Sequence, residues 1–131
     1  MDELNDKDLI GITALLIHAA KIDENYTDKE KKLILQFIES QIKDKSNVKE
    51  VLDKAHLLES NSNQLLSFTN LIKKYSLEFK TIIIKELWKI IISDSEVDMY
   101  ESNIIRRICG LIYFPDKISG EIKLSLDKGN K

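Results

Sequence analysis

The chain has 131 residues, of which 43% are hydrophobic and 32% are charged, as in ordinary soluble globular proteins. Its 20 basic and 22 acidic side chains leave a formal net charge of −2, which does not favour nucleic acid or an anionic membrane as a partner. This length predicts one domain, residues 1–131, large enough to bury a core of its own.

Helices are the secondary structure that the apolar pattern predicts. Apolar residues recur at intervals of three and four without strand-like alternation, so the expected fold class is all-α, a single compact bundle. About seven helices are expected, in chain order over residues 6–21, over residues 28–42, after a capping Ser46, through Leu65 to Ile72, after an opening Ser76, from near Met99, and as a short helix with Pro115 at its first position. Residues 127–131 are expected to form a frayed tail.

The apolar stripes of these helices also predict the core. Phe37 and Trp88 lie on such stripes and are expected to be largely buried in one core. Gly11 lies inside the first helix, where glycine is unfavourable, so a close helix crossing is expected there. Cys109 lies on the apolar stripe of the sixth helix and is expected to be a small core residue. The third helix is expected to bury Val48, Val51, Leu52, Ala55 and Leu58.

Location is predicted from three features. The single cysteine excludes an internal disulfide and favours a reducing compartment. The first ten residues are acidic where a signal peptide would be basic. Residues 82–92, the most apolar stretch, are too short and too charged to span a bilayer. A cytoplasmic protein without a membrane span is therefore expected.

An internal repeat relates the two halves of the chain. Asp94 lies 71 residues after Asp23, and the same shift superimposes apolar positions on both sides of these aspartates. Leu16, Ile17, Ala20, Leu33, Ile34 and Phe37 fall on Leu87, Trp88, Ile91, Ile104, Ile105 and Ile108. This offset predicts that helices one and two match helices five and six as a pseudo-two-fold pair.

The repeat contains an acidic segment between helices, here called the first joint (residues 23–30, DENYTDKE) and the second joint (residues 94–101, DSEVDMYE). Each joint ends in a capping box, from Thr27 to Glu30 and from Asp98 to Glu101. Capping does not explain Asp23, Asp94 or Glu96, which follow the C-terminal end of a helix. A carboxylate there costs about 0.3–1 kcal/mol at an exposed site.

A bound cation would offset this cost. Oxygen donors at alternate positions, with one further on, are typical of the beginning of calcium loops. The joints are not EF-hands, because Met99 and Ile105 stand where the second would need glycine and glutamate. The sequence therefore predicts a divalent cation, Ca²⁺ or Mg²⁺, at Asp94, Glu96, Asp98 and Glu101 and, in the first joint, at Asp23 and Glu30. Capping and solvation alone are the alternative.

Two segments, LLIHAAKIDENYTDKEKKLI (15–34) and LWKIIISDSEVDMYESNIIRRICGLI (87–112), resemble the TerB-like family of tellurite-resistance proteins. The likeness covers about residues 9–126 and is most specific over residues 94–108. It implies a bundle of about seven helices with internal two-fold similarity, an acidic patch that binds divalent metal, and a link to bacterial stress or metal resistance. The family's glycine after the aspartate is Glu24 in one joint and Ser95 in the other.

Other chemistry finds little support in the sequence. His18 and His56 have no further ligand at zinc spacing and are expected to be packed or surface residues. Phosphate-binding and nucleophile motifs are absent from the sequence, so no catalytic residues, no cofactor site and no enzyme are expected. Arg106 and Arg107 are expected to meet a joint carboxylate or a partner's carboxylate or phosphate.

These features predict an interaction or sensing module that binds a protein partner. A purely structural protein–protein module with capped joints is the second hypothesis, and a carboxylate-based enzyme is the third. The sequence does not predict an oligomeric state.

Overall fold

The computed structural model describes residues 6–21, 28–42, 45–61, 65–92 and 99–129. These residues form seven α-helices and one short 3-10 helix, and they contain no strand. The prediction of an all-α fold is therefore confirmed. The elements are α1 (Asp6–Ala20), α2 (Asp28–Gln41), η1 (Lys45–Asn47), α3 (Val48–Asn61), α4 (Leu65–Ile72), α5 (Leu77–Ile92), α6 (Met99–Leu111) and α7 (Asp116–Gly129).

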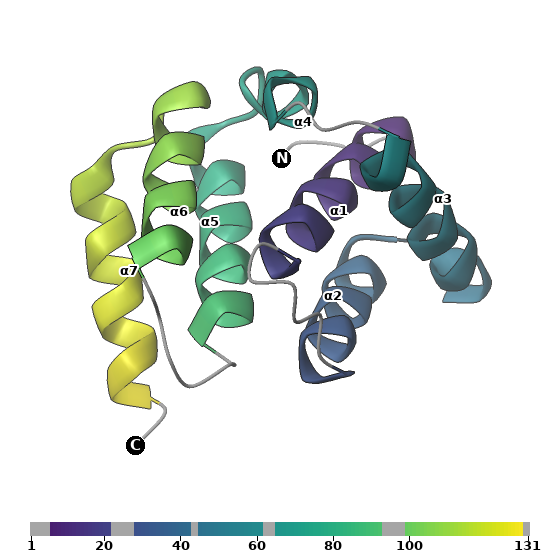
Figure 1. The fold of residues 1–131 in the computed structure, drawn as a ribbon, viewed down its shortest axis with the longest axis horizontal. Helices are drawn as coiled ribbons and strands as arrows, with labels where there is room; N and C mark the ends of the chain where they lie inside the picture. The colour runs from purple at the N-terminus through teal and green to yellow at the C-terminus, as the bar shows by residue number, and fades with distance from the viewer. Residues whose placement is uncertain (1–5, 22–27, 43–44, 62–64, 93–98, 130–131) are drawn as a thin grey trace.

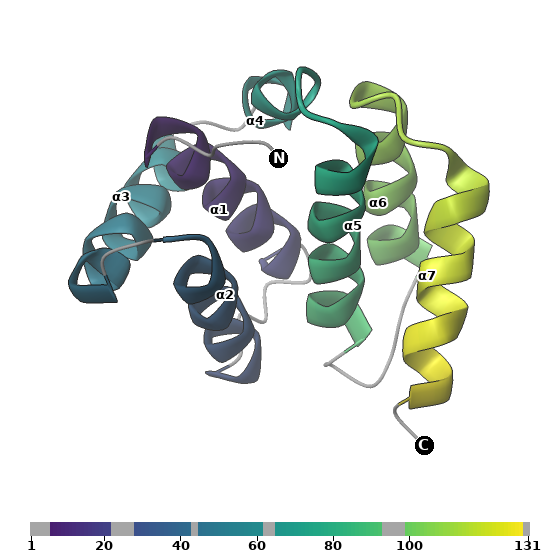
Figure 2. The same ribbon diagram turned by 180° about the vertical axis from the view of Figure 1, so that it is seen from behind.

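The helices form two groups, α1 to α4 and α5 to α7 (Figures 1 and 2), which meet where α1 and α2 contact α5 and where α4 contacts α6. Helix α1 contacts α2, α3, α4 and α5, and it is the centre of the first group. Helices α5, α6 and α7 contact one another and run side by side, up and down, in the second group. In the part of the chain that the structure describes, no helix is long and apolar enough to cross a membrane.

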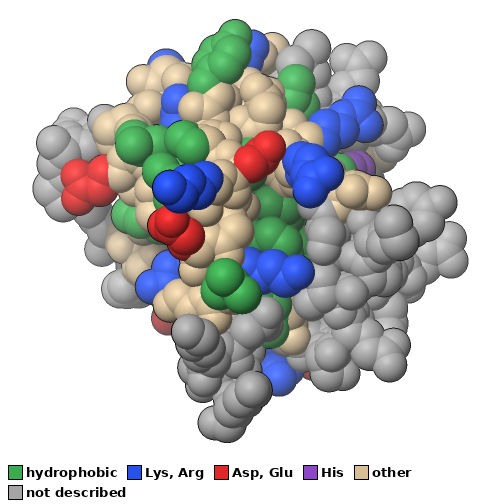
Figure 3. Space-filling model, turned by 90° about the vertical axis from the view of Figure 1, so that its left-hand side faces the viewer, with side chains coloured by type: hydrophobic (Ala, Val, Ile, Leu, Met, Phe, Trp, Pro, Cys, Tyr) green, Lys and Arg blue, Asp and Glu red, His purple; other side chains and the backbone are tan. Residues whose placement is uncertain are grey.

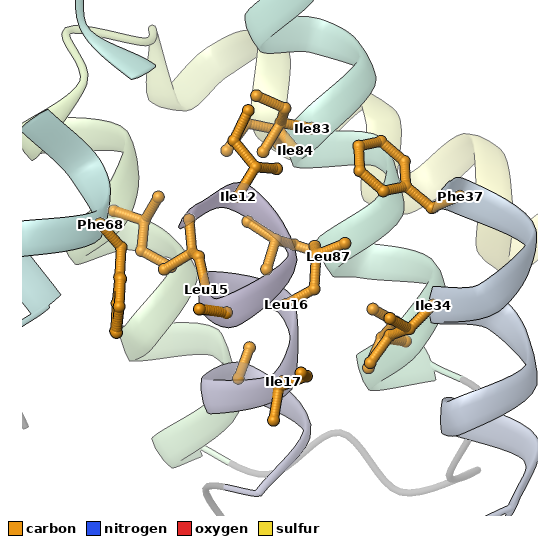
Figure 4. Packing of buried hydrophobic residues seen from close by; sticks show 14 of the residues in the cluster. Ile12, Leu15, Leu16, Ile17, Ile34, Phe37, Phe68, Ile83, Ile84 and Leu87 are labelled. Atoms are coloured by element: carbon orange, nitrogen blue, oxygen red, sulfur yellow. The ribbon is translucent and has the colours of Figure 1, made fainter. Parts of the chain in front are cut away.

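A single cluster of buried hydrophobic side chains contains residues from each of the helices α1, α2, α3, α4, α5 and α6. Partly buried side chains of α7 pack against this cluster. Figure 4 shows Leu15 of α1 directed at Phe68 of α4, while Leu87 of α5 and Ile34 of α2 lie on the other side of α1. Phe37 and Trp88 are only 2% and 5% exposed. The prediction that both belong to one core is confirmed, as is the burial of Cys109.

Local signals place several helix ends and contacts where the sequence predicts them. The Phe79 N–H donates to Ser76 Oγ over 3.2 Å, so Ser76 caps α5. A Cβ atom added to Gly11 would lie 2.1 Å from Leu71 Cδ1, which confirms a close crossing of α1 and α4 at this glycine.

The beginning of α1 is tied to the link between α4 and α5 by a buried carboxylate. Asp8 is 2% exposed, accepts a hydrogen bond from the Tyr75 hydroxyl, and lies 2.9 Å from Lys74 Nζ. Burial acts to raise the pKa of Asp8, but the hydrogen bonds from Tyr75 and Lys74 outweigh it and hold the pKa below its ordinary value.

The predictions for α3 were partly wrong. Leu58 is 38% exposed, because the inward position in the last turn of α3 is Glu59, whose carboxylate pairs with His18 of α1 and with Lys21, the residue after α1. Ser46 lies within η1 and therefore does not directly precede α3. Val51, Leu52 and Ala55 are buried as predicted, and Val48 is partly buried.

Helix α7 also differs from its prediction. It has 14 residues and is therefore not short, and it begins one residue after Pro115, whose carbonyl accepts from the Ser119 N–H. It extends through Gly129, into the segment predicted as a frayed tail. Of the six predicted repeat pairs, five are buried at both positions, whereas Leu33 is only partly buried and its counterpart Ile104 is buried. That the two helix pairs superpose stays a prediction.

Candidate functional site

The two joints lie between helices whose ends the structure describes. Helix α1 ends at Ala20 and α2 begins at Asp28, while α5 ends at Ile92 and α6 begins at Met99. Of the six predicted ligands, Asp23, Asp94, Glu96 and Asp98 lie outside the described residues, and Glu101 belongs to the first turn of α6 with its side chain outside them. A cation at the joints therefore stays a prediction.

Glu30 is the predicted ligand whose surroundings are described. It lies in the first turn of α2 and is 3% exposed, whereas its neighbours Asp28, Lys29 and Lys31 are exposed. The positive end of the helix dipole favours a carboxylate at this position. Its place as the third residue of α2, three positions after Thr27, is that of the glutamate in a capping box.

The end of α1 that precedes the first joint carries a charged cluster, which we call the Glu59 cluster (His18, Lys21 and Glu59). Lys21 Nζ lies 3.0 Å from Glu59 Oε1, and His18 Nδ1 lies 3.3 Å from Glu59 Oε2. Burial, followed by the charges of Lys21 and Lys31, lowers the pKa of the nearby His56. Within the described ranges, no group of three or more His, Cys, Asp or Glu side chains could hold a metal ion.

The structure also brings together a site that the sequence did not predict. A hollow of about 190 Å³, open to solvent and here called the Trp88 pocket, lies between α5, α6 and α7. Its lining residues are Trp88, Ile105, Arg106, Asp116, Ser119, Gly120 and Lys123. The side of the molecule nearest α7 carries basic, acidic and apolar side chains close together (Figure 3).

Hydrogen bonds fix the inner wall of the Trp88 pocket. The Trp88 indole Nε1–H donates to Ser119 Oγ over 2.9 Å, and both residues are 5% exposed. The Lys123 ammonium lies 5.3 Å from the centre of the Trp88 ring, a distance at which the ring attracts a cation.

Burial raises the pKa of the neighbouring Cys109 thiol to about 11, although a hydrogen bond from Ser119 acts to lower it. This cysteine is therefore an unreactive thiol at neutral pH.

Sequence signals for this pocket were weak. Arg106 was expected to meet a carboxylate, and both Arg106 and Arg107 are exposed on α6. Ser119, Gly120 and Lys123 carried no signal that distinguishes them from other residues of an amphipathic helix. Their contact with Trp88 depends on how α7 packs against α5.

Comparison with known proteins adds one finding. Residues 9–124 match the model of the family described as tellurite resistance protein TerB. The match covers nearly the whole chain and includes both joints. Neither the curated proteins nor the solved structures yield a significant match.

Proposed function

Because this chain belongs to the TerB family, we propose that it is a non-enzymatic helical module that binds a divalent cation at its second joint and contacts a protein partner. The ligands are the carboxylates of Asp94, Glu96, Asp98 and Glu101. Oxygen atoms of this kind are what Ca²⁺ and Mg²⁺ prefer.

The observation that carries the proposal is the position of two of these carboxylates relative to the helix ends. Helix α5 ends at Ile92 and α6 begins at Met99, so Asp94 is the second residue after the negative end of the α5 dipole and Glu96 is the fourth. A carboxylate close to that end costs about 0.3–1 kcal/mol at an exposed site, and the effect falls off within about one turn. Lys89, the basic residue in the last turn of α5, lies 3.3 Å from Glu86 and is therefore already paired.

The first joint is the weaker cation site in this proposal. At the four positions that match the second joint's ligands it has only two carboxylates, Asp23 and Glu30, because Asn25 and Thr27 are neutral. The position of Glu30 as the third residue of α2 favours a capping role for that residue. We therefore propose that the second joint binds the cation and that the first joint mainly caps α2.

A second hypothesis is a structural protein–protein module in which both joints are caps, and the position of Glu30 as the third residue of α2 favours it. A carboxylate-based enzyme is a third hypothesis that no described residue favours. A role in metal stress forms part of our proposal and is supported by the description of the family alone. A cytoplasmic location also belongs to the proposal and is supported by the single cysteine, which favours a reducing compartment.

Isothermal titration calorimetry with Ca²⁺ and then Mg²⁺, at low salt, tests the proposal. We expect a saturable heat in the wild type that disappears in Asp94→Asn. Asp53→Asn is the matched control, because Asp53 is exposed in the middle of α3, and it should bind like the wild type. No heat with either ion in the wild type, or equal heats in Asp94→Asn and the wild type, would overturn the cation site.

A further inference from the structure

We propose that the Trp88 pocket binds a monocarboxylate with a short apolar group. Two sources share this chemistry, a free small organic acid and the C-terminal residue of a protein partner. The inference concerns α5, α6 and α7 and does not rest on the cation site.

The inner wall of the Trp88 pocket provides apolar surface. Trp88 and Ile105 line it, and both are largely buried. Since the indole N–H already donates to Ser119 over 2.9 Å, Trp88 needs no polar partner from a ligand. Trp88 is 5% and Ile105 is 1% exposed, so the accessible apolar wall is small and a short aliphatic group is enough to cover it.

The rim of the pocket selects a negative charge. Two of the lining residues, Arg106 and Lys123, are basic and one, Asp116, is acidic, so their formal charges sum to +1. None of them belongs to an ion pair among the described residues. A guanidinium binds a carboxylate through two parallel hydrogen bonds, and Lys123 already lies over the Trp88 ring at the pocket wall. Phosphate has no apolar group to cover the Trp88 wall, so it should bind more weakly than a carboxylate that has one.

A glycine keeps the pocket open. Gly120 lies inside α7 and lines the pocket, and a Cβ atom there would meet nothing within 4 Å. Packing therefore does not require this glycine, unlike Gly11, although a glycine in a helix interior costs about 1 kcal/mol relative to alanine. A larger side chain at this position would enter the open space where we place the ligand.

The volume limits the size of the ligand. A hollow of about 190 Å³ is smaller than the roughly 300–1,000 Å³ of typical cofactor and drug sites. It is sufficient for one acid of amino-acid size. So few ligand atoms predict weak binding, with a Kd of about 1 mM for the free acid.

The experiment uses Trp88 itself as the probe, because the chain contains one tryptophan. The full chain is titrated with 4-methylpentanoate, with 4-methylpentanamide and with inorganic phosphate. Trp88 fluorescence and the single indole N–H resonance in a ¹H–¹⁵N spectrum report binding. We expect saturable shifts with the carboxylate and at least about tenfold weaker binding of the amide, which lacks the charge.

Two glycine variants distinguish filling of the pocket from the general effect of adding a leucine side chain to a helix. Gly120→Leu should weaken carboxylate binding at least about tenfold, because its side chain fills the pocket. Gly110→Leu is the matched control, because Gly110 is also a helical glycine with nothing within 4 Å of a Cβ atom but does not line the pocket. It should bind like the wild type. Circular dichroism melting curves establish that both variants fold.

A peptide arm distinguishes the two sources. Tetra-alanyl-leucine with an acetylated N-terminus is compared with the same peptide amidated at its C-terminus. Binding of the free-acid peptide at least about tenfold tighter than 4-methylpentanoate supports the proposal and assigns a protein C-terminus; equal or weaker binding assigns the free acid. The proposal is overturned if the wild type shows no saturable shift with either carboxylate, if phosphate binds as tightly, or if Gly120→Leu binds like the wild type.

Discussion

The crossing of α1 and α4 at Gly11 gives a prediction whose sign depends on a second residue. In Gly11→Ala, the new Cβ would lie 2.1 Å from Leu71 Cδ1 and 3.6 Å from Leu71 Cγ. Leu71 must therefore move, and overpacking of this kind costs about 1–3 kcal/mol. The alanine gains about 1 kcal/mol of helix propensity. We expect a net destabilisation of about 0–2 kcal/mol.

Removing Leu71 should reverse this effect. In a Leu71→Ala background the overlap is gone, since Cδ1 and Cγ are the two atoms within 4 Å of the new Cβ. Gly11→Ala should then stabilise the chain by up to about 1 kcal/mol. Gly120→Ala, in open space, should stabilise by a similar amount and serves as the control for helix propensity.

Urea unfolding followed by circular dichroism gives the free energy of unfolding of the wild type, Gly11→Ala, Leu71→Ala and the double variant, which together form a double-mutant cycle. The coupling energy between the two sites should be about 1–3 kcal/mol. If Gly11→Ala stabilises the wild type as much as Gly120→Ala does, α1 and α4 do not cross closely at this position. That result would refute the packing on which the first helix group depends.

Three further predictions concern the core and its charges. Trp88→Ala should cost about 3–5 kcal/mol, since Trp88 is 5% exposed and bonded to Ser119; a loss below about 1 kcal/mol in urea unfolding would place α5 in a different register. Leu52→Ala should cost about 2–5 kcal/mol, whereas Leu58→Ala, at a 38% exposed site, should cost much less; equal losses would contradict the orientation of α3. Asp8 has a pKa below its ordinary value of 3.8, so its ionised form stabilises the fold above that pH and the contribution is lost as the pH falls through the lower folded-state pKa. Asp8→Asn should therefore lower the free energy of unfolding at neutral pH, and this free energy should fall less between neutral and acid pH than in the wild type. If it falls as much in Asp8→Asn as in the wild type, Asp8 is not held by Tyr75 and Lys74.

Helix ends were predictable because the signals that set them are local. The serine cap of α5 and the acidic start of α2 lie within a few residues of the ends they determine. Helices α1, α2 and α6 begin at the residues that the sequence predicts, and α1 and α2 end within one residue of their predictions. Gly11 was also informative, because a glycine within an apolar helix has few explanations other than close packing.

Features that depend on distant contacts were not predictable. Leu58 and Glu59 are neighbours, and only the positions of His18 at the end of α1 and of Lys21 just after it decide that Glu59 faces inward. The Trp88 pocket requires three helices at once, and its wall depends on a hydrogen bond between residues 31 positions apart. Periodicity shows which face of a helix is buried, but it does not show which helix covers that face.

The melting temperature with and without calcium, in the wild type and in Asp94→Asn, tests the proposed cation site most directly. A cation that binds the folded chain with a Kd of about 1 mM should add about 1.4 kcal/mol at 10 mM calcium, which is a shift of several degrees. We predict this shift in the wild type and none in Asp94→Asn, with the metal-free variant as stable as the wild type or slightly more so because a charge after α5 is removed. Melting temperatures of the wild type that do not change with calcium or magnesium would contradict the cation site and favour joints that only cap α2 and α6.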